Sequence, residues 1–429
     1  MSTAFFYIFI LLLALGTPVV FALLIGPGLS LLLDEQTRYF PALLTRFYNG
    51  IDSFPLLAVP FFILAGELMN SGGITRSIVG FAQSLVGHVR GGLAQVNILS
   101  AMMFSGISGS AVADASAIGK MLIPAMEQQG YRRDFSAAVT AAAAVIGPVI
   151  PPSGIMVLYG FVMNVSVGAL FAAGVVPGVM IGLGLMLIVR VLAKRNGLPP
   201  AAPRASWRER GTALKGAYLA LLMPAILLGG MLSGIFTATE AAAVAVAYAL
   251  VVVLFVLRTV GFADLRRIFV ATAVQSGVIL LLVGAAVTFG WLVTVSGMAT
   301  RIAETLIGIS DDVYLLLFLV NLLLFLIGMF LDAGPAILIL GPVLAPIFIE
   351  LGVDPVHFAM IMCVNLTVGL ATPPMGLVLF VTASVSGEPV GRIVRAILPF
   401  LAVEFAVIFL ITYFPALTLT LPRWLGLMQ

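Results

Sequence analysis

Residues 147–154, GPVIPPSG, return 222 positions later as residues 369–376, GLATPPMG. The correspondence extends without a gap from 110–177 to 332–399, where 11 residues are identical and eight of these are Gly or Pro. Consecutive prolines remove amide donors and disfavour the α conformation at the preceding residue, so a helix should open at each copy. A duplicated backbone with matching helix breaks indicates a transporter built from two repeats.

The composition is that of a membrane protein. Of the 429 residues, 62% are hydrophobic and 9% are charged, and the mean hydropathy is +1.19. We predict an all-α polytopic membrane protein with about 11 to 13 embedded transmembrane helices or shorter segments. The apolar run 5–33 has no basic segment before it and no small-residue cleavage site, so we interpret it as the first span and not as a signal peptide.

The basic residues report topology. The densest basic segment, 194–215, carries six Lys or Arg residues and one acid, and the positive-inside rule places it in the cytoplasm. Two spans follow before Arg258, Arg266 and Arg267, which the same rule also places on the cytoplasmic side. The net charge of +3 is spread over loops, which gives no indication of a nucleic-acid partner.

A second polar break opens each repeat. The first repeat has SGISGSAVAD at 105–114, and the second has DAGP at 332–335 in the equivalent register. A surface loop between two ordinary spans is the alternative interpretation, and the second copy argues against it. Because a bilayer tolerates unwound backbone only where protein or a wet cavity covers it, we expect each segment to line a cavity.

Opened helices expose backbone carbonyls and amides. Carbonyls of 147–150 and 369–372, with the hydroxyls of Ser108, Ser110 and Thr372, predict oxygen cages with few formal charges. Such cages suit Na⁺ better than a divalent ion. Half-helix N-termini at the same breaks suit an anionic group, so we expect a carboxylate substrate coupled to a monovalent cation.

Over essentially its full length the chain resembles the large membrane (M) subunit of the tripartite ATP-independent periplasmic (TRAP) transporters. The matching stretches are PLLAVPFFILAGELMNSGGIT (55–75), SGISGSAVADASAIGKMLIPAMEQQGY (105–131), IPPSGIMVLYG (150–160), GIFTATEAAAVAVAYAL (234–250) and DPVHFAMIMCVNLTVGLATPPMGLVLFV (354–381).

The resemblance implies a multi-pass secondary active transporter of the bacterial inner membrane, and not an enzyme. It implies Na⁺ symport, uptake of a dicarboxylate, keto acid or sugar acid, and two partners: a small membrane (Q) subunit and a periplasmic substrate-binding (P) protein. It also implies inverted-topology repeats that move as a transport domain against a scaffold, an elevator mechanism. The re-entrant hairpin tips are expected near 105–113 and 332–336.

Site residues follow from the same resemblance. One Na⁺ site falls on Ser108, Ser110, Gly147 and Ile150. The second, placed by repeat symmetry, falls on Asp332, Gly334, Gly369 and Thr372. Candidates for substrate binding are Ser105, Ser110, Pro151, Ser153, Thr372 and Pro373. Beyond Na⁺ as coupling ion, we expect no metal, because His88 and His357 have no Cys or acidic pair at ligand spacing.

The predicted organisation has six parts. They are N-terminal scaffold spans (1–95), transport repeat 1 with a hairpin and a broken helix (96–193), a cytoplasmic basic linker (194–216), second scaffold or arm spans (217–312), transport repeat 2 (313–400) and a C-terminal span (401–429). Within apolar segments, Glu67 and Glu240 are expected to cap or bind helix ends. Asn97, Asn321 and Asn365 are expected to make interhelical hydrogen bonds.

Three other functions compete with a TRAP permease. A membrane-embedded enzyme needs a nucleophile with a base, a carboxylate pair or a metal set, and the chain has no HExxH, no GxSxG and only one cysteine. A channel has no need of duplicated hairpins. A self-sufficient Na⁺/carboxylate symporter fits the repeats equally well, and only the motif match argues against it.

Overall fold

Every regular element in the described part of the chain is a helix, as a bilayer requires of segments that must satisfy their own backbone groups. The computed structural model describes residues 3–195, 198–199, 202–310 and 312–428, so residues 196–197 and 200–201 of the predicted linker lie outside it. Within these ranges, seven helices are long and apolar enough to cross a membrane: Phe54–Ser71, Val167–Lys194, Trp207–Leu232, Ala238–Val256, Phe262–Val295, Ala333–Glu350 and Val390–Tyr413.

The predicted single span over 5–33 is wrong. Two helices, α1 (Ala4–Ala14) and α2 (Val19–Leu33), occupy this region and pack against each other. The chain turns between them because Gly16 adopts a φ of 80° and Pro18 immediately precedes α2. At a rise of about 1.5 Å per residue, neither helix reaches across a bilayer of about 30 Å.

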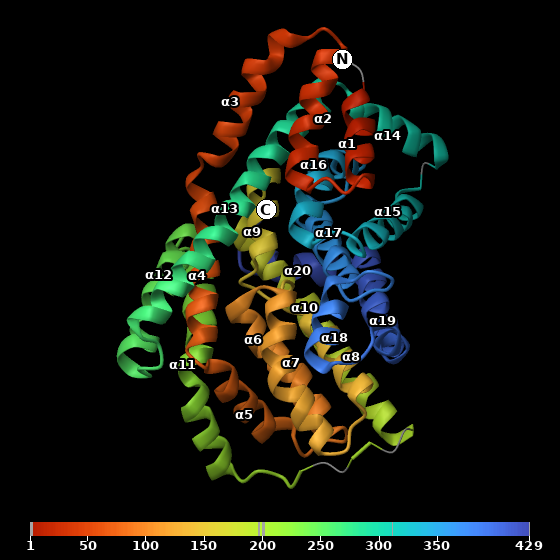
Figure 1. Ribbon diagram of the computed structural model, residues 1–429. Helices are drawn as coiled ribbons and strands as arrows, with labels where there is room; N and C mark the ends of the chain where they lie inside the picture. The colour runs from red at the N-terminus through yellow and green to blue at the C-terminus, as the bar shows by residue number, and fades with distance from the viewer. Residues whose placement is uncertain (1–2, 196–197, 200–201, 311, 429) are drawn as a thin grey trace.

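Helices α1–α5 and α11–α14 form a group that we call the framework (Figure 1). Within it α4 packs against α12, α5 against α11, and α13 against α2 and α3. The bounds not yet given are η1 (Thr37–Tyr39), α3 (Phe40–Ile51), η2 (Phe54–Leu57), α4 (Ala58–Ser71), α5 (Ile74–Val86), α11 (Trp207–Leu232), α12 (Ala238–Val251), the π-helical η3 (Val252–Val256), α13 (Phe262–Val295) and α14 (Met298–Ile309).

The remaining helices form two sets of five in the same order. The first set is α6 (Gly92–Ser108), α7 (Ala111–Gln128), α8 (Arg133–Ala144), α9 (Gly154–Met163) and α10 (Val167–Arg195). The second is α15 (Val313–Gly328), α16 (Ala333–Glu350), α17 (Pro355–Gly369), α18 (Leu377–Ser386) and α19 (Val390–Tyr413), followed by α20 (Ala416–Trp424). The 222-residue offset maps α7 onto α16 residue for residue, so the repeat in the sequence is a repeat of helices.

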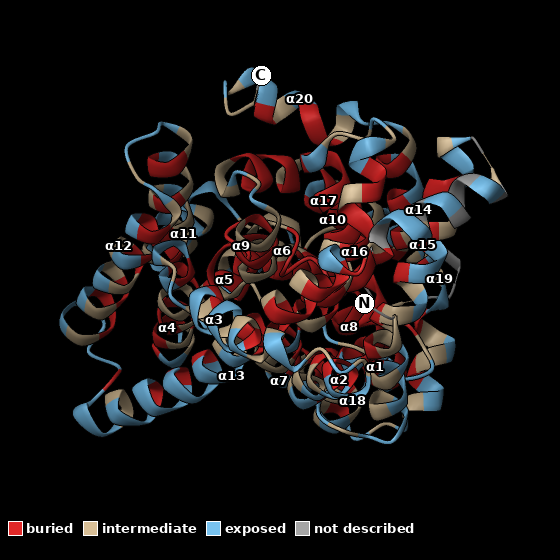
Figure 2. Ribbon diagram, turned by 90° about the horizontal axis from the view of Figure 1, so that it is seen from above, coloured by how far each residue is buried: buried red, intermediate tan, exposed pale blue. Residues whose placement is uncertain are grey.

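The two sets interlock. Helix α7 packs against α18, α8 against α19, and α9 against α16. Residues 356–369 of α17 are all buried, and α8 is alanine-rich and almost wholly buried, which allows neighbouring backbones to approach closely. Figure 2 shows this buried centre in red, with more exposed residues on the framework helices.

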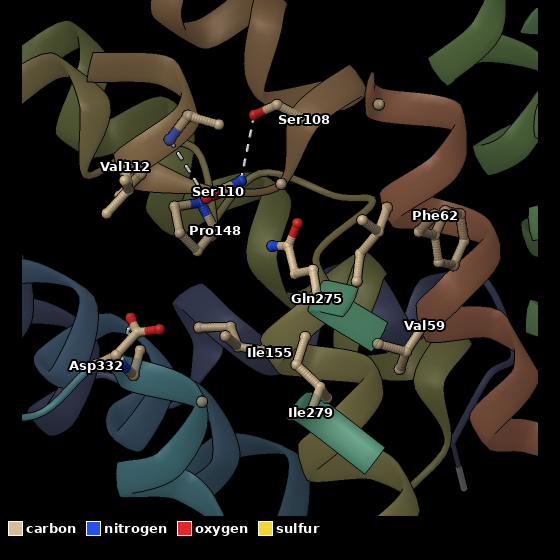
Figure 3. A pocket seen from close by; sticks show the side chains of 18 of the residues that line it. Val59, Phe62, Ser108, Ser110, Val112, Pro148, Ile155, Gln275, Ile279 and Asp332 are labelled. Atoms are coloured by element: carbon tan, nitrogen blue, oxygen red, sulfur yellow. Dashed lines mark hydrogen bonds between the residues drawn. The ribbon is translucent and has the colours of Figure 1, made fainter. Parts of the chain in front are cut away.

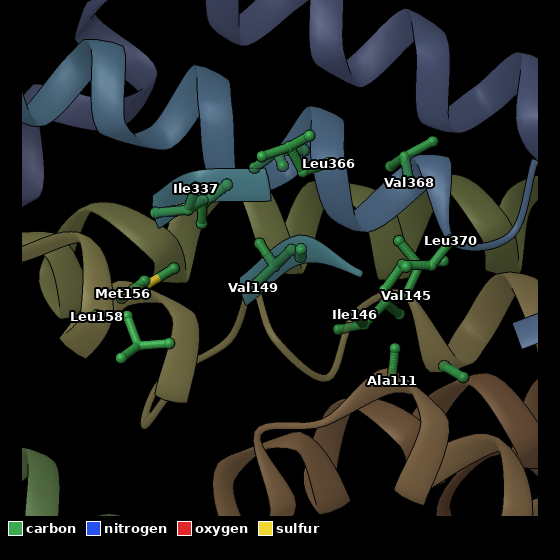
Figure 4. Packing of buried hydrophobic residues seen from close by; sticks show 14 of the residues in the cluster. Ala111, Val145, Ile146, Val149, Met156, Leu158, Ile337, Leu366, Val368 and Leu370 are labelled. Carbon is green, nitrogen blue, oxygen red and sulfur yellow. The ribbon is translucent and has the colours of Figure 1, made fainter. Parts of the chain in front are cut away.

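The helix breaks lie inside this core. Residues 145–153, the first break, separate α8 from α9, and residues 370–376, the second break, separate α17 from α18. Figure 4 shows Val145 and Val149 of the first break in one apolar cluster with Leu366 and Leu370 from the second set. The predicted openings at the double prolines are therefore confirmed. Protein covers the first break, whereas Pro374 and Met375 of the second break are exposed.

The predicted domain limits do not all coincide with helix ends. Helix α19 continues through residue 400, and α11 already begins at Trp207 inside the predicted linker. The inverted orientation of the repeats and their movement against the framework stay predictions.

Candidate functional site

A cavity of about 330 Å³ lies where the framework meets both helix sets (Figure 3). One wall comes from α4 and α13, and the opposite wall from the starts of α7, α9 and α16. The framework contributes Val59, Phe62, Ile63, Gly66, Glu67, Asn70, Gln275, Ile279 and Leu282. The two sets contribute residues 107–113, Pro148, Pro152, Gly154, Ile155, Leu158, residues 332–335 and Leu370.

The first hairpin, α6 and α7, turns at Gly109 and Ser110. Gly109 has a φ of 60°, and a Cβ there would lie 2.9 Å from the Pro152 carbonyl oxygen, so glycine is required for the turn to rest on the first break. Ser110 is the N-cap of α7 and accepts a hydrogen bond from the Ala113 amide at 3.4 Å. A turn within the predicted range 105–113 is therefore confirmed, and the re-entrant course of the hairpin stays a prediction.

The second hairpin, α15 and α16, turns between Gly328 and Ala333. Asp332 is the N-cap of α16, and its Oδ1 accepts a hydrogen bond from the Ala333 amide at 2.8 Å. Figure 3 shows the Asp332 carboxylate at the cavity, on the hairpin that faces the Ser110 turn. The tip predicted at 332–336 thus begins at the last residue of the turn, Asp332, and continues into the first turn of α16.

Three residues of the first predicted Na⁺ site converge. Ser108 Oγ accepts a 3.2 Å hydrogen bond from the Ser110 amide, and it donates one to Asp114 Oδ1. A Cβ added at Gly147 would overlap Asp114 Oδ2, so the first break approaches the same group. The fourth residue, Ile150, packs its side chain against Gly178 of α10, which leaves only its backbone for a ligand role.

Asp114 is the residue that the sequence interpretation missed. Its side chain is fully buried, and it lies in the first turn of α7, four residues after the Ser110 cap. An acid in the first turn after a hairpin cap, in a chain with only 9% charged residues, is the local signal that could have identified it.

The second predicted Na⁺ site is less compact. Asp332 and Gly334 line the cavity. Gly369 instead packs on the Gly328 backbone, where an added Cβ would lie 2.5 Å from the Gly328 carbonyl carbon. Thr372 donates to the Val368 carbonyl at 2.9 Å and lines a separate groove between α15 and α19.

Of the six candidates for substrate binding, Ser110 lines the cavity. Ser105 and Ser153 are fully buried and donate to backbone carbonyls, of Met102 at 2.7 Å and Pro148 at 2.6 Å. Pro373 lines the α15–α19 groove with Thr372, and it is Pro152 rather than Pro151 that lines the cavity. Glu67 and Gln275, which the sequence did not assign to a substrate, do line it.

The electrostatics of the cavity combine two opposite features. Three helices, α7, α9 and α16, begin at its wall and direct the partial positive charge of their N-termini toward it. The charged side chains among its described lining residues are both acids, Glu67 and Asp332. The lining thus offers amides and oxygen ligands, but neither Lys nor Arg among the residues described.

Several polar residues in apolar segments have structural roles. Glu240 forms a capping box with Thr237 at the start of α12, which confirms the cap predicted there. Asn97 donates to Thr140 at 2.7 Å, and Asn365 donates to Asn321 at 2.6 Å, so interhelical hydrogen bonds are confirmed. Among the described residues, no three or more His, Cys, Asp or Glu side chains form a cluster that could hold a metal ion.

Comparison with known proteins places this geometry among transporters. Residues 6–417 match the profile of the family "Tripartite ATP-independent periplasmic transporter, DctM component". The chain is 43% identical over 413 residues to the sialic acid TRAP transporter large permease protein SiaM of Vibrio cholerae, covering 96% of each chain.

Two further relatives differ in their named substrates. The chain is 39% identical over 386 residues to the C4-dicarboxylate TRAP transporter large permease protein DctM of Pseudomonas aeruginosa, covering 90% of each. It is 37% identical over 414 residues to the 2,3-diketo-L-gulonate TRAP transporter large permease protein YiaN of Escherichia coli, covering 96% of this chain and 97% of that one. The fold is similar to that of the YdaH transporter of Alcanivorax borkumensis, with a TM-score of 0.63, 17% identity, and 92% and 89% of the two chains covered.

Proposed function

Because the chain belongs to the DctM family of tripartite ATP-independent periplasmic transporters, we propose that it is the large permease subunit of a Na⁺-coupled carboxylate importer. It is a multi-pass protein of the inner membrane. The relatives named above carry sialic acid, C4-dicarboxylates and 2,3-diketo-L-gulonate, which are all acids. A carboxylate is therefore the substrate class that fits this chain.

The observation that carries the proposal is the charge of the cavity. Three helix N-termini attract an anion, whereas Glu67 and Asp332 repel it, and the described lining supplies no Lys or Arg to offset them. Bound Na⁺ would supply the missing positive charge beside the substrate. Coupling then has an electrostatic cause, because the anion binds well only after the cations have bound.

The residues present fit such a cation. The first site, on Ser108, Ser110, Gly147 and Ile150, lies where a hairpin turn and an opened helix expose hydroxyl and carbonyl oxygens. The second would use Asp332 and Gly334, which line the cavity, whereas Gly369 and Thr372, the repeat partners of Gly147 and Ile150, lie outside the cavity lining. Oxygen ligands with few carboxylates favour a monovalent ion. The bound ion would hold the substrate carboxylate electrostatically, and these residues would orient it.

The position of the cavity supports movement of the two sets against the framework. Phe62 and Gln275 come from the framework, while Ser110 and Asp332 come from the two hairpins. A displacement between the two groups would change which side of the membrane the cavity faces. In Figure 1 α6 and α7 lie in the lower half of the view and α16 in the upper half, which favours hairpins that enter from opposite sides.

We further propose the two partners of a tripartite system, a small membrane (Q) subunit and a periplasmic binding (P) protein. Selectivity would then reside largely in the binding protein, since a cavity lined by amides, Glu67, Asp332 and apolar side chains has few groups that distinguish one acid from another.

The test is uptake in proteoliposomes that contain this chain and its cognate small membrane subunit. Acidic metabolites are scanned under an inward Na⁺ gradient, with K⁺ and choline gradients as controls, and with and without the cognate binding protein. Uptake that needs both Na⁺ and the binding protein is expected. Na⁺-driven uptake without the binding protein would instead identify a self-sufficient Na⁺/carboxylate symporter, and uptake indifferent to Na⁺ would refute the coupling.

A further inference from the structure

Asp114 is a fully buried acid beside the cavity. Its Oδ1 accepts a hydrogen bond from Ser108, whereas its Oδ2 has no hydrogen-bond partner among the described residues. The unpartnered oxygen lies against Gly147, because a Cβ at that glycine would overlap it. The carboxylate thus sits between the first hairpin and the first break, in contact with both.

A carboxylate in this place needs a positive partner. A buried, unpaired ionised acid costs several kcal/mol, and a single hydroxyl donor does not offset that cost. The described residues place no Lys or Arg in an ion pair with Asp114. Its neighbours are the Ser108 hydroxyl and the opened backbone at Gly147, and hydroxyl and carbonyl oxygens are groups that can coordinate a cation.

We infer that Asp114 is a direct ligand of the cation at the first site, through the oxygen that faces Gly147. The inference rests on the proposed Na⁺ coupling and extends it, because the first site then contains a full negative charge and not only hydroxyl and carbonyl dipoles. One carboxylate among neutral oxygens retains the preference for a monovalent ion.

The repeat supports an equal charge at the two sites. Asp332 gives the second site one carboxylate, and Asp114 gives one to the first. These acids do not occupy equivalent positions, since the 222-residue offset pairs Asp114 with Ala336 and Asp332 with Ser110. Each hairpin helix therefore supplies one acid, from its cap in α16 and from one turn further along in α7.

The experiment measures cation binding without transport. The purified protein in detergent is titrated with NaCl at constant ionic strength, balanced with choline chloride, and thermal stability is followed without substrate. Asp114→Asn keeps the size of the side chain and removes its charge. We expect it to raise the Na⁺ concentration for half-maximal stabilisation by about tenfold or more, equivalent to about 1.4 kcal/mol. Asp134→Asn, at a buried acid on α8 that pairs with Arg132, is the matched control and should leave the Na⁺ titration unchanged.

A second variant tests the same inference in case Asp114→Asn does not fold. Gly147→Ala keeps the Asp114 charge but displaces its carboxylate, and it should weaken Na⁺ binding in the same direction. Equal Na⁺ stabilisation of the wild type, Asp114→Asn and Gly147→Ala would overturn the inference while leaving Na⁺ coupling intact. Absence of Na⁺ stabilisation in the wild type, together with uptake that ignores Na⁺, would overturn both.

Discussion

Ser110 and Asp332, 222 positions apart, cap the two hairpin helices that begin at the cavity. Ser110 Oγ accepts from the Ala113 amide at 3.4 Å, and Asp332 Oδ1 accepts from the Ala333 amide at 2.8 Å. Equivalent positions of the two repeats therefore carry a neutral cap in one set and a charged cap in the other. A substitution that keeps the cap but removes the charge shows which of the two properties matters for transport.

Asp332→Asn keeps a side-chain oxygen for the cap and removes the charge from the second predicted Na⁺ site. We expect the Hill coefficient for Na⁺ activation of uptake to fall from about 2 toward 1, because one of two coupled sites is weakened. Initial uptake rates at saturating substrate and varied Na⁺ measure this. Asp354→Asn makes the same change at the cap of α17, outside both predicted Na⁺ sites, and serves as the control. Unchanged cooperativity in Asp332→Asn would remove this residue from the ion site.

Ser108→Ala deletes a hydroxyl that contacts both Ser110 and Asp114. The Na⁺ dependence of uptake should weaken because the lost oxygen belongs to the predicted ion site. This loss should be several-fold larger than any decrease in the amount of folded protein in the membrane. Uptake against Na⁺ concentration is compared with the monodisperse fraction on size-exclusion chromatography. Ser84→Ala removes a helix hydroxyl bound to the Phe81 carbonyl in α5 and serves as control. Parallel losses in both variants would indicate only a structural role for Ser108.

Glu67 is the other acid in the cavity lining, but it comes from α4 and belongs to neither predicted ion site. Glu67→Gln should lower the KM for an anionic substrate by up to about fivefold, because it removes a repulsion of about 1 kcal/mol. The Na⁺ dependence should stay unchanged. Substrate titrations at fixed saturating Na⁺ provide the measurement. A raised KM would instead mean that Glu67 binds the substrate or a cation.

The hairpin tips and helix breaks were predictable because their signals are local. Double prolines at 151–152 and 373–374 open a helix wherever they stand, and Gly109 and Asp332 are a turn residue and a helix cap by their own chemistry. The repeat added a second copy of each signal. These residues set the start of α7 and α16, which is why the predicted positions agree with the helix bounds.

Convergence in space was not predictable in the same way. Ser108 and Asp114 lie on the same hairpin, but Gly147 meets Asp114 only because that hairpin rests on the first break, which is a contact between segments distant in the chain. The split of residues 5–33 into two helices was missed because uniform hydropathy conceals a turn. Gly16 and Pro18 were its only local signs.

Substitution of Asn321 and Asn365 measures how much their hydrogen bonds contribute to the stability of the second set. Asn365 donates to Asn321 at 2.6 Å, and Asn321 donates to Thr412 at 3.2 Å, which joins α15, α17 and α19. Asn365→Ala should cost about 0.6 to 1.7 kcal/mol and lower the melting temperature in detergent. A double-mutant cycle with Asn321→Ala isolates the pair. Additive losses would show that the two side chains contribute independently.

The contact between α13 and α16 tests whether the helix sets move against the framework. A Cβ at Gly290 would lie 3.2 Å from Pro342 Cβ, so Gly290→Cys with Pro342→Cys can form a disulfide after a shift of a few tenths of an ångström. The native Cys363 is fully buried and should not compete. We expect oxidation to arrest uptake and reductant to restore it, because the bond ties a framework helix to a hairpin.

The matched control places the same bond within the framework. A Cβ at Gly50 of α3 would lie 2.9 Å from Val287 Cβ of α13, so Gly50→Cys with Val287→Cys links two helices that are expected to stay fixed relative to each other. Uptake should survive this link. Mass spectrometry establishes the yield of each disulfide before transport is measured. Full activity with the Gly290–Pro342 link formed would refute the elevator movement, since transport would then proceed with hairpin and framework joined.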